Sequence, residues 1–312
     1  MHTRRKPPSY AHAAGACMAG ALRRPRHRLF SLSASLRTAD PGQAIYSFRG
    51  AGTDSLELLA RDFGAESLPL TVSFRCPREV VRVAQQYVEH IESSPTAARG
   101  EVVIEPAHPK TTPRDEYWEA NLAEHFGPLG ETDAILCRAN APLIEQAFRL
   151  LRDGVGFALR GRGLGLERLV AGTRADDLES LMSVLGKQLE AATAKDESEQ
   201  KVFNLEDRIA CVRIIADSLP TEQRTIPGLL AAIRNLFRNA DNVVTLSSIH
   251  QAKGLEWDRV FVLRDGLRRV SGRTGRPLSK RQSREEDNIQ YVACTRAQRC
   301  LVLLKQPPRR GE

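Results

Sequence analysis

The sequence predicts an α/β fold, because short apolar runs alternate along the chain with segments of helical periodicity. Residues 243–246 and 259–263 are rich in β-branched and apolar side chains, as expected of buried strands. Residues 178–189, 205–218 and 226–237 instead repeat apolar side chains at helical spacing. With 312 residues, the chain has room for two domains, or for one large domain that carries an insertion.

Positive charge is concentrated at the start of the chain. Eight Lys and Arg residues precede Asp40 and no acidic residue does, so this segment accounts for the whole net charge of +8. Basicity alone therefore does not predict nucleic-acid binding. Residues 1–38 lack a usable hydrophobic period and are predicted to be disordered. The alternatives for this segment are an organellar transit peptide and non-native sequence fused to a truncated gene.

The six cysteines are scattered and form no C-x-x-C pair, so the sequence predicts neither a zinc site nor a disulfide framework. This usage is typical of a reducing interior, and we expect an intracellular protein in the cytoplasm, associated with the nucleoid. No stretch approaches the roughly 18 consecutive apolar residues of a membrane helix. We therefore expect no metal ligands and no membrane partner.

The segment DPGQAIYSFRGA, residues 40–51, is the first that suggests chemistry. It places two aromatic side chains, Tyr46 and Phe48, beside Arg49. Taken by itself, this pattern is interpreted as a pair of aromatic residues in a hydrophobic core.

The next segment, LPLTVSFRCPREVVRVAQQ at residues 68–86, predicts a strand, a turn at residues 76–77 and a helix. Arg75 lies at the end of the strand, where an arginine is usually a surface charge. Strands are also predicted at residues 101–105 and 133–137.

The strand at residues 133–137 leads into Arg138 and Asn140, and a helix is predicted from Pro142 because proline is favourable in a first helical turn. From residue 162 to residue 241 the pattern becomes helical, and we predict a short helical insertion. Within it, residues 192–200 (ATAKDESEQ) are predicted to be a polar linker.

Residues 243–263, VVTLSSIHQAKGLEWDRVFVL, predict two strands joined by a polar loop. We expect this arrangement to place His250, Lys253, Gly254 and Glu256 together at one edge of a sheet, where ligands bind in open α/β folds. A solvated surface loop is the alternative.

Residues 285–304, EEDNIQYVACTRAQRCLVLL, predict a helix followed by a last strand at residues 300–304. Arg296 lies between the two.

Four of these segments resemble, in chain order, motifs III to VI of superfamily 1 DNA helicases of the UvrD/Rep type. The matching segments are residues 40–51, 68–86, 243–263 and 285–304. The resemblance covers about residues 39–312 and implies the end of the first motor domain and the whole second motor domain. It implies a RecA-like parallel sheet of the P-loop NTPase type, in the C-terminal part of an ATP-dependent helicase or translocase. Such enzymes move 3′ to 5′ on single-stranded DNA.

The resemblance also implies roles for individual residues. Gln43 would sense the γ-phosphate of ATP, Arg75 would reach the phosphates, and Arg296 would be the arginine finger. Phe74 stands where the family more often has tyrosine. Gly254 and Glu256 would lie at the nucleotide. The implied contacts to DNA are Tyr46, Phe48, Arg49, Arg138, Asn140, Ser248, His250 and Lys253.

The phosphate loop of this family is absent from the sequence. No G-x-x-x-x-G-K-[ST] occurs, and Gly186-Lys187 lacks the first glycine and the hydroxyl. No apolar strand ends in the Asp-Glu pair that would hold Mg²⁺. We therefore expect residues 39–64 to be a remnant of the first motor domain and residues 65–312 to be the second. ATP and Mg²⁺ would be shared with a missing first motor domain.

Three hypotheses follow for the function. The chain could be a truncated helicase without ATPase activity of its own, which we favour. It could complete an ATPase in trans with a P-loop-bearing partner chain, or it could be a non-catalytic module that binds DNA or protein. In each case the apolar side chains of residues 45–48 lack their usual partner surface, so we expect them to fold back onto the second domain or to bind a partner.

Overall fold

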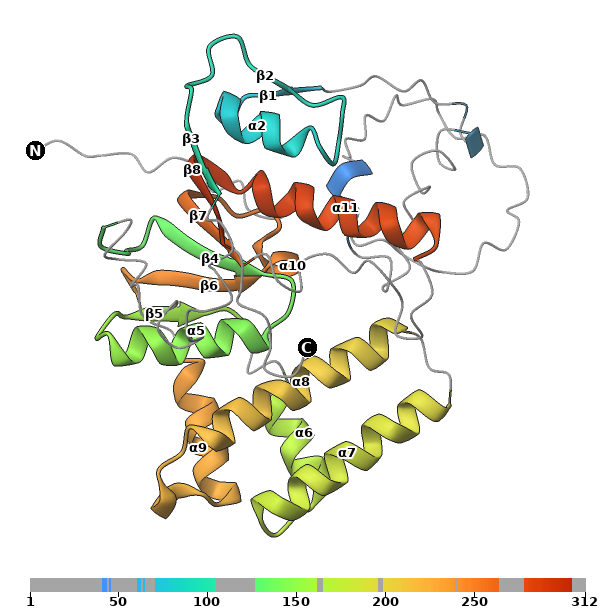
Figure 1. The fold of residues 1–312 in the computed structure, drawn as a ribbon, viewed down its shortest axis with the longest axis vertical. Helices are drawn as coiled ribbons and strands as arrows, with labels where there is room; N and C mark the ends of the chain where they lie inside the picture. The colour runs from blue at the N-terminus through green and yellow to red at the C-terminus, as the bar shows by residue number, and fades with distance from the viewer. Residues whose placement is uncertain are drawn as a thin grey trace, which may run out of the picture.

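A six-stranded parallel sheet forms the centre of the computed structural model (Figure 1). The structure describes residues 41–43, 45, 61–62, 64, 71–104, 127–161, 165–195, 199–238, 241–263 and 278–304. The strand order is β3-β8-β7-β4-β6-β5, and every pairing is parallel. The strands are β3 (Glu101–Ile104), β4 (Asp133–Cys137), β5 (Phe157–Leu159), β6 (Val244–Ser248), β7 (Trp257–Leu263) and β8 (Ala297–Leu304). The predicted α/β class with a parallel sheet is confirmed.

Both faces of this sheet are covered, which is why its central strands are apolar without alternation. All residues of β4 and β6 are buried. Along β4, Ala134 and Leu136 pack into one core, whereas Ile135 and Cys137 pack into the other. Successive side chains of a strand point to opposite faces, so β4 divides the domain into two hydrophobic layers.

The first layer contains α2 (Arg78–Ala84), α10 (Ile249–Ala252) and α11 (Lys280–Cys294). The short 3-10 helix η1 (Pro41–Gln43) packs against α11, and the Ile45 side chain is fully buried in the same core. Ile45 therefore folds back onto this domain, as expected, while Tyr46 and Phe48 lie outside the described residues. Beside α2, a small parallel sheet joins β1 (Val72–Ser73) to β2 (Glu92–Ser93).

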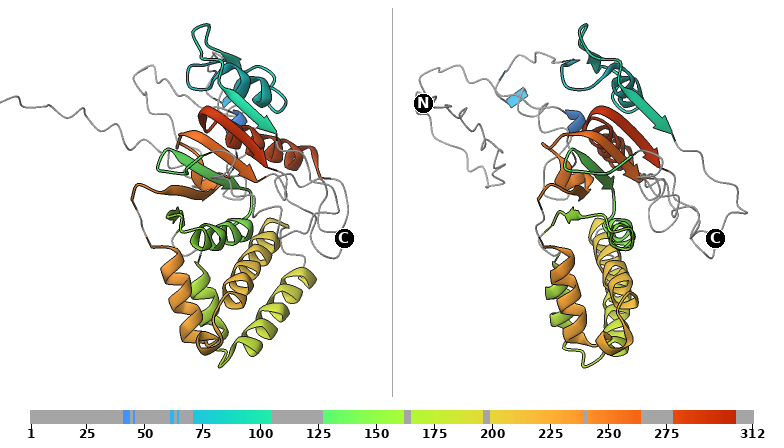
Figure 2. Two further views of the ribbon diagram at one scale, coloured as in Figure 1. Left: turned by 60° about the vertical axis from the view of Figure 1, so that its left-hand side comes forward. Right: turned by 90° about the vertical axis from the view of Figure 1, so that its left-hand side faces the viewer.

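The second layer contains α5 (Ala141–Arg152) and the helices that follow it (Figure 2). These helices are α6 (Leu166–Thr173), α7 (Leu178–Ala194), α8 (Glu199–Asp217), η4 (Thr221–Gln223) and α9 (Ile226–Leu236). Their apolar faces join α5 in one continuous core, so the helical segment is packed onto the sheet domain. The predicted linker at residues 192–200 was wrong in extent, because α7 continues to Ala194 and α8 begins at Glu199.

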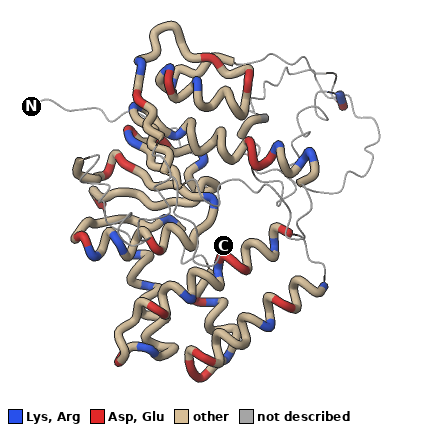
Figure 3. The backbone as a smooth tube through the Cα atoms, in the orientation of Figure 1, with Lys and Arg blue, Asp and Glu red and all other residues tan. Residues whose placement is uncertain are grey.

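The caps of these helices follow from the sequence. Asp177 accepts a hydrogen bond from the Ser180 amide at the start of α7, and Thr225 accepts one from the Gly228 amide at the start of α9. Such caps satisfy amide groups that have no partner inside the helix. Figure 3 shows that the positions of acidic and basic residues are interspersed along the described helices. None of the described helices combines the length and the apolar character needed to cross a membrane.

Candidate functional site

The connection from β6 to β7 separates the predicted site residues between two edges of the sheet. Both strands pair parallel with β4, with Ser248 opposite Cys137 and Arg259 opposite Asp133. Ser248 therefore lies at the carboxyl edge, whereas Glu256 directly precedes β7 at the amino edge. The expectation that His250, Lys253, Gly254 and Glu256 share one edge was wrong, because parallel neighbours require a crossover between opposite edges.

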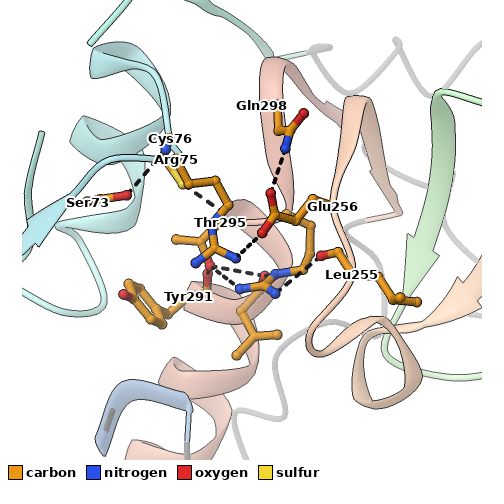
Figure 4. Close-up of polar contacts among 10 residues, drawn as sticks. Ser73, Arg75, Cys76, Leu255, Glu256, Tyr291, Thr295 and Gln298 are labelled. Atoms are coloured by element: carbon orange, nitrogen blue, oxygen red, sulfur yellow. Dashed lines mark hydrogen bonds and ion pairs between the residues drawn. The ribbon is translucent and has the colours of Figure 1, made fainter. Parts of the chain in front are cut away.

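Arg75, Glu256, Arg296 and Gln298 form a group at the amino edge, which we call the amino-edge cluster (Figure 4). Arg75 follows β1, Glu256 precedes β7, and Arg296 immediately precedes β8. Arg75 Nη1 donates to Glu256 Oε1 at 3.0 Å, and Gln298 Nε2 donates to Glu256 Oε2 at 2.5 Å. Both carboxylate oxygens of Glu256 are thus bound by side chains from other elements.

The Arg296 side chain is fully buried beneath this group. Its Nε donates to Val292 O at 3.0 Å, its Nη1 to Leu255 O at 3.3 Å, and its Nη2 to Thr295 Oγ1 at 3.1 Å. Burial lowers the pKa of Arg296 to about 10, and the neighbouring charge of Arg75 acts in the same direction. The helix end at Thr295 places the guanidinium here, since α11 terminates where β8 begins.

The amino-edge cluster carries more positive than negative charge. Arg75 and Arg296 supply two guanidinium groups, and within the cluster only Glu256 supplies a carboxylate. Arg75 Nε is also buried without a hydrogen-bond partner among the described residues. Next to it, the Phe74 side chain is 83% exposed. Sequence analysis gave Phe74 no role, although its position before Arg75 in the matched segment was the available signal.

Two further residues predicted at the nucleotide, Gln43 and Gly254, lie in η1 and in the crossover, next to Lys253, which was predicted to contact DNA. Lys253 Nζ donates to the Gln43 carbonyl oxygen at 2.8 Å, which ties the crossover to the 3-10 helix η1. Lys253 thus contacts the 3-10 helix that contains Gln43. Gly254 has φ +87°, a left-handed conformation that glycine adopts without strain. Arg49, like Tyr46 and Phe48, lies outside the described residues.

At the carboxyl edge, Arg138 is held inside the domain. Its side chain is 5% exposed, and its Nη2 lies 3.3 Å from Glu286 Oε1 on α11 and 3.3 Å from Gln200 Oε1 on α8. The guanidinium carbon lies 5.1 Å from the centre of the Phe203 ring. The sequence placed Arg138 at DNA, whereas the structure directs its guanidinium towards α8 and α11. Glu286 was missed because it lies 148 residues away from Arg138 in sequence.

Asn140 and Ser248 complete the carboxyl edge. Asn140 Nδ2 donates to Asp207 Oδ2 at 2.7 Å, and the Asn140 amide N–H donates to the same carboxylate. Ser248 is buried at the end of β6, and His250 follows it within α10, partly buried. Asp207 was missed by sequence analysis, since a lone acidic residue on a helix gives no local indication of its partner.

Comparison with known proteins shows which family this chain resembles. Residues 170–306 match the family model of the UvrD-like helicase C-terminal domain. The chain carries a UvrD-like helicase C-terminal domain. The match runs from the end of α6 to just beyond β8 and includes both Glu256 and Arg296.

Sequence similarity to two curated relatives covers more of this chain than residues 170–306. It is 28% identical over 307 residues to "ATP-dependent DNA helicase UvrD2" of Mycobacterium tuberculosis (strain ATCC 25618 / H37Rv), covering 85% of this chain and 42% of the relative. It is 27% identical over 303 residues to "F-box DNA helicase protein 1" of Schizosaccharomyces pombe, covering 92% of this chain and 32% of that protein. The chain therefore spans less than half the length of either relative.

A solved structure described as the C-terminal domain of a possible DNA helicase from Lactobacillus plantarum WCFS1 aligns with a TM-score of 0.32 and 14% identity. The alignment covers 75% of this chain and 89% of that one. The parallel topology described above stands on the strand pairings of the UvrD-like chain itself.

Proposed function

We propose that this chain supplies the second motor domain's side of the ATP site in a UvrD-like DNA helicase or translocase that moves 3′ to 5′. The observation that carries the proposal is the amino-edge cluster, where two guanidinium groups face one carboxylate. A surplus of arginine charge suits the phosphates of a nucleotide, because guanidinium groups bind phosphate oxygens with paired N–H donors.

The residues of the cluster fit an ATP molecule. The Arg75 guanidinium, whose side chain is 30% exposed, can donate to a phosphate oxygen, and the exposed ring of Phe74 beside it can stack on an adenine. When bound, ATP would supply the γ-phosphoryl group that is transferred to water. Arg75 would hold its phosphates, Glu256 would orient Arg75, and Arg296 would add positive charge beside them. Gln43 and Gly254 would approach the nucleotide from η1 and the crossover.

Hydrolysis of ATP would require a second protein surface on the other side of the nucleotide. The 312 residues contain no phosphate loop and no paired carboxylates for Mg²⁺ at the end of an apolar strand. We therefore propose that ATP and Mg²⁺ are shared with a first motor domain, and that this chain alone has no ATPase activity. A P-loop-bearing partner chain would make the same site in trans.

Single-stranded DNA is the proposed second ligand. UvrD2 and F-box DNA helicase protein 1 are both named DNA helicases, and the segment around Tyr46, Phe48 and Arg49 combines aromatic and basic side chains. Base stacking on aromatic rings is independent of sequence, and phosphate contacts make the affinity fall as salt rises.

Steady-state phosphate release from the purified chain, with and without single-stranded DNA, tests the ATPase proposal. We expect background rates in both cases. DNA-stimulated turnover that the Arg75→Met variant abolishes, and that the matched variant Arg82→Met retains, would show that the chain needs no first motor domain. Arg82 is an exposed arginine on α2, outside the amino-edge cluster.

Fluorescence anisotropy with a labelled single strand at two salt concentrations tests the DNA proposal. We expect weak binding that falls as salt rises, and weaker binding for Tyr46→Ala. Binding that is absent, or independent of salt, would instead favour a protein-interaction module.

A further inference from the structure

One face of α8 holds the turn between β4 and α5. The α8 residues Gln200, Phe203 and Asp207 are spaced by three and four residues, so they lie on the same side of the helix. Gln200 and Phe203 contact the Arg138 guanidinium, and Asp207 accepts hydrogen bonds from Asn140. The position of this turn therefore depends on a helix more than 60 residues away in sequence.

Asp207 makes the densest set of contacts in this arrangement. Its carboxylate accepts from the Asn140 amide N–H at 2.9 and 3.0 Å, from the Ala141 amide N–H at 2.9 Å and from Asn140 Nδ2 at 2.7 Å. Asp207 is only 9% exposed. The residue after Ala141 is Pro142, which has no N–H, so the carboxylate satisfies the first amides of α5. Its negative charge is stabilised there by the amino end of the helix.

The same carboxylate fixes the orientation of the Asn140 side chain. Among the described residues, the Asn140 side-chain amide makes one hydrogen bond, from Nδ2 to Asp207 Oδ2. The second Nδ2 hydrogen and the amide oxygen are therefore left for an external group, and Asn140 is only partly buried. By contrast, the Arg138 guanidinium is buried against Glu286 and Gln200.

We infer that Asp207 is a positioning residue for the binding of single-stranded DNA. It holds the Asn140 side chain in the orientation in which that side chain contacts the DNA backbone. The inference rests on the proposed DNA-binding function and adds to it the element of the helical segment that sets the contact. A side-chain amide that is already held in one rotamer loses less conformational freedom on binding than a free one. Removal of the Asp207 carboxylate should therefore weaken the contact between Asn140 and DNA. The carboxylate does not itself contact DNA.

Equilibrium binding of a fluorescent oligo(dT) to the full chain tests this inference. The variants are Asp207→Ala, Asp207→Asn, Asn140→Ala and the double variant of Asp207→Ala with Asn140→Ala. Asp217→Asn is the matched control, because Asp217 lies on the same helix but is exposed and faces Arg224. Thermal unfolding of each variant confirms that it is folded at the temperature of the binding measurement.

We expect Asp207→Ala and Asn140→Ala each to weaken binding by about fivefold, in keeping with the net contribution of one hydrogen bond. The double variant should bind as weakly as the single variants, because both remove the same contact. Asp207→Asn should keep part of the affinity, and Asp217→Asn should match the wild type.

Four results would overturn the inference. Wild-type affinity in folded Asp207→Ala would show that Asp207 only stabilises the fold, and losses that add in the double variant would show that Asp207 and Asn140 act separately. Tighter binding by Asp207→Ala would show that the carboxylate obstructs DNA. Absence of binding by the wild type would overturn the proposed DNA function as well, whereas the first three outcomes leave that function standing.

Discussion

Arg75 at the amino edge and Arg138 at the carboxyl edge each pair with a glutamate, but the two pairs differ in burial. The Arg75 and Glu256 side chains are 30% and 37% exposed, whereas those of Arg138 and Glu286 are 4% and 7% exposed. Arg138 also contacts Gln200 and lies over Phe203. A solvent-exposed pair contributes little to stability and can exchange its partner, whereas a buried pair fixes one arrangement.

The comparison shows that an arginine that follows a strand can either bind an external anion or hold elements of its own domain together. At the amino edge, the arginine charge exceeds the carboxylate charge, which suits an external anion, whereas the buried Nε atoms of Arg75 and Arg138 alike have no partner among the described residues. At the carboxyl edge, carboxylates from α8 and α11 already bind the turn. The predictions that follow test this difference, from the largest expected effect to the smallest.

The largest loss of stability is expected for Arg138→Met. The substitution removes the cation that faces the buried carboxylate of Glu286, and such losses cost about 3–5 kcal/mol. Arg75→Met should cost less than about 1 kcal/mol, because the Arg75–Glu256 pair is partly exposed and screened by solvent. Urea unfolding of both variants measures the difference in free energy of unfolding.

The double variant of Arg138→Met with Glu286→Leu provides the control. It should recover much of the stability, since it removes both charges and leaves an apolar contact. Equal losses of unfolding free energy for Arg138→Met and Arg75→Met would contradict the difference in burial between the ion pairs at the two edges.

A smaller loss is expected for Arg296→Ala. The alanine leaves the carbonyl oxygen of Leu255 without its donor, whereas Val292 O keeps the Thr295 hydroxyl, and an unsatisfied buried acceptor costs about 1–3 kcal/mol. Arg296→Lys should recover only part of it, because one ammonium cannot reproduce the planar set of donors. The free energy of unfolding in urea gives both values, and an unchanged value for Arg296→Ala would mean that the guanidinium is not held in the core.

The pH dependence of stability should reveal the buried thiol of Cys137. Burial raises the pKa of Cys137 from 9.0 to about 12, and the nearby Asp207 charge acts in the same direction. Above pH 9 the unfolded chain loses this proton while the folded chain keeps it, so stability falls as pH rises towards 12. The loss is about 1.4 kcal/mol per pH unit for one group.

Cys137→Ala should show a shallower fall than the wild type when urea unfolding is repeated between neutral pH and pH about 10. Burial also raises the pKa of Cys76, but the charges of Arg75 and Arg296 oppose that rise. The corresponding change in slope for Cys76→Ala should therefore be smaller. Identical slopes for the wild type and Cys137→Ala would contradict a buried, protonated thiol.

Much of the fold was predictable because its strands and helices have clear periodic patterns. The strand at Asp133–Cys137 has the predicted bounds, and the helix at Ile226–Leu236 differs from its prediction by one residue. Ends set by tertiary contacts were less predictable. Of the strand expected near residues 68–75, the structure describes residues 71–75, and among these Val72–Ser73 form the strand, where β2 supplies the partner.

The site was predictable as a set of residues but not as an arrangement. The motifs named Arg75, Glu256 and Arg296, which the structure brings into one cluster. The sequence could not show that the chain crosses the sheet between Ser248 and Glu256, because strand direction depends on pairing with β4. It also could not show Asp207 or Glu286, whose partners are distant in sequence.

The central claim is that the amino edge, and not the carboxyl edge, receives nucleotide phosphates. Arginine side-chain NMR of the full chain, with selective nitrogen-15 labelling, tests it during titration with ATP and, as a control, with adenosine. Arg75→Lys and Arg138→Lys assign the two Nε–H signals. We predict that ATP shifts the Arg75 signal saturably, that adenosine does not, and that the Arg138 signal stays in place. A shift at Arg138 with an unchanged Arg75 signal, or no shift at either arginine, would contradict the account.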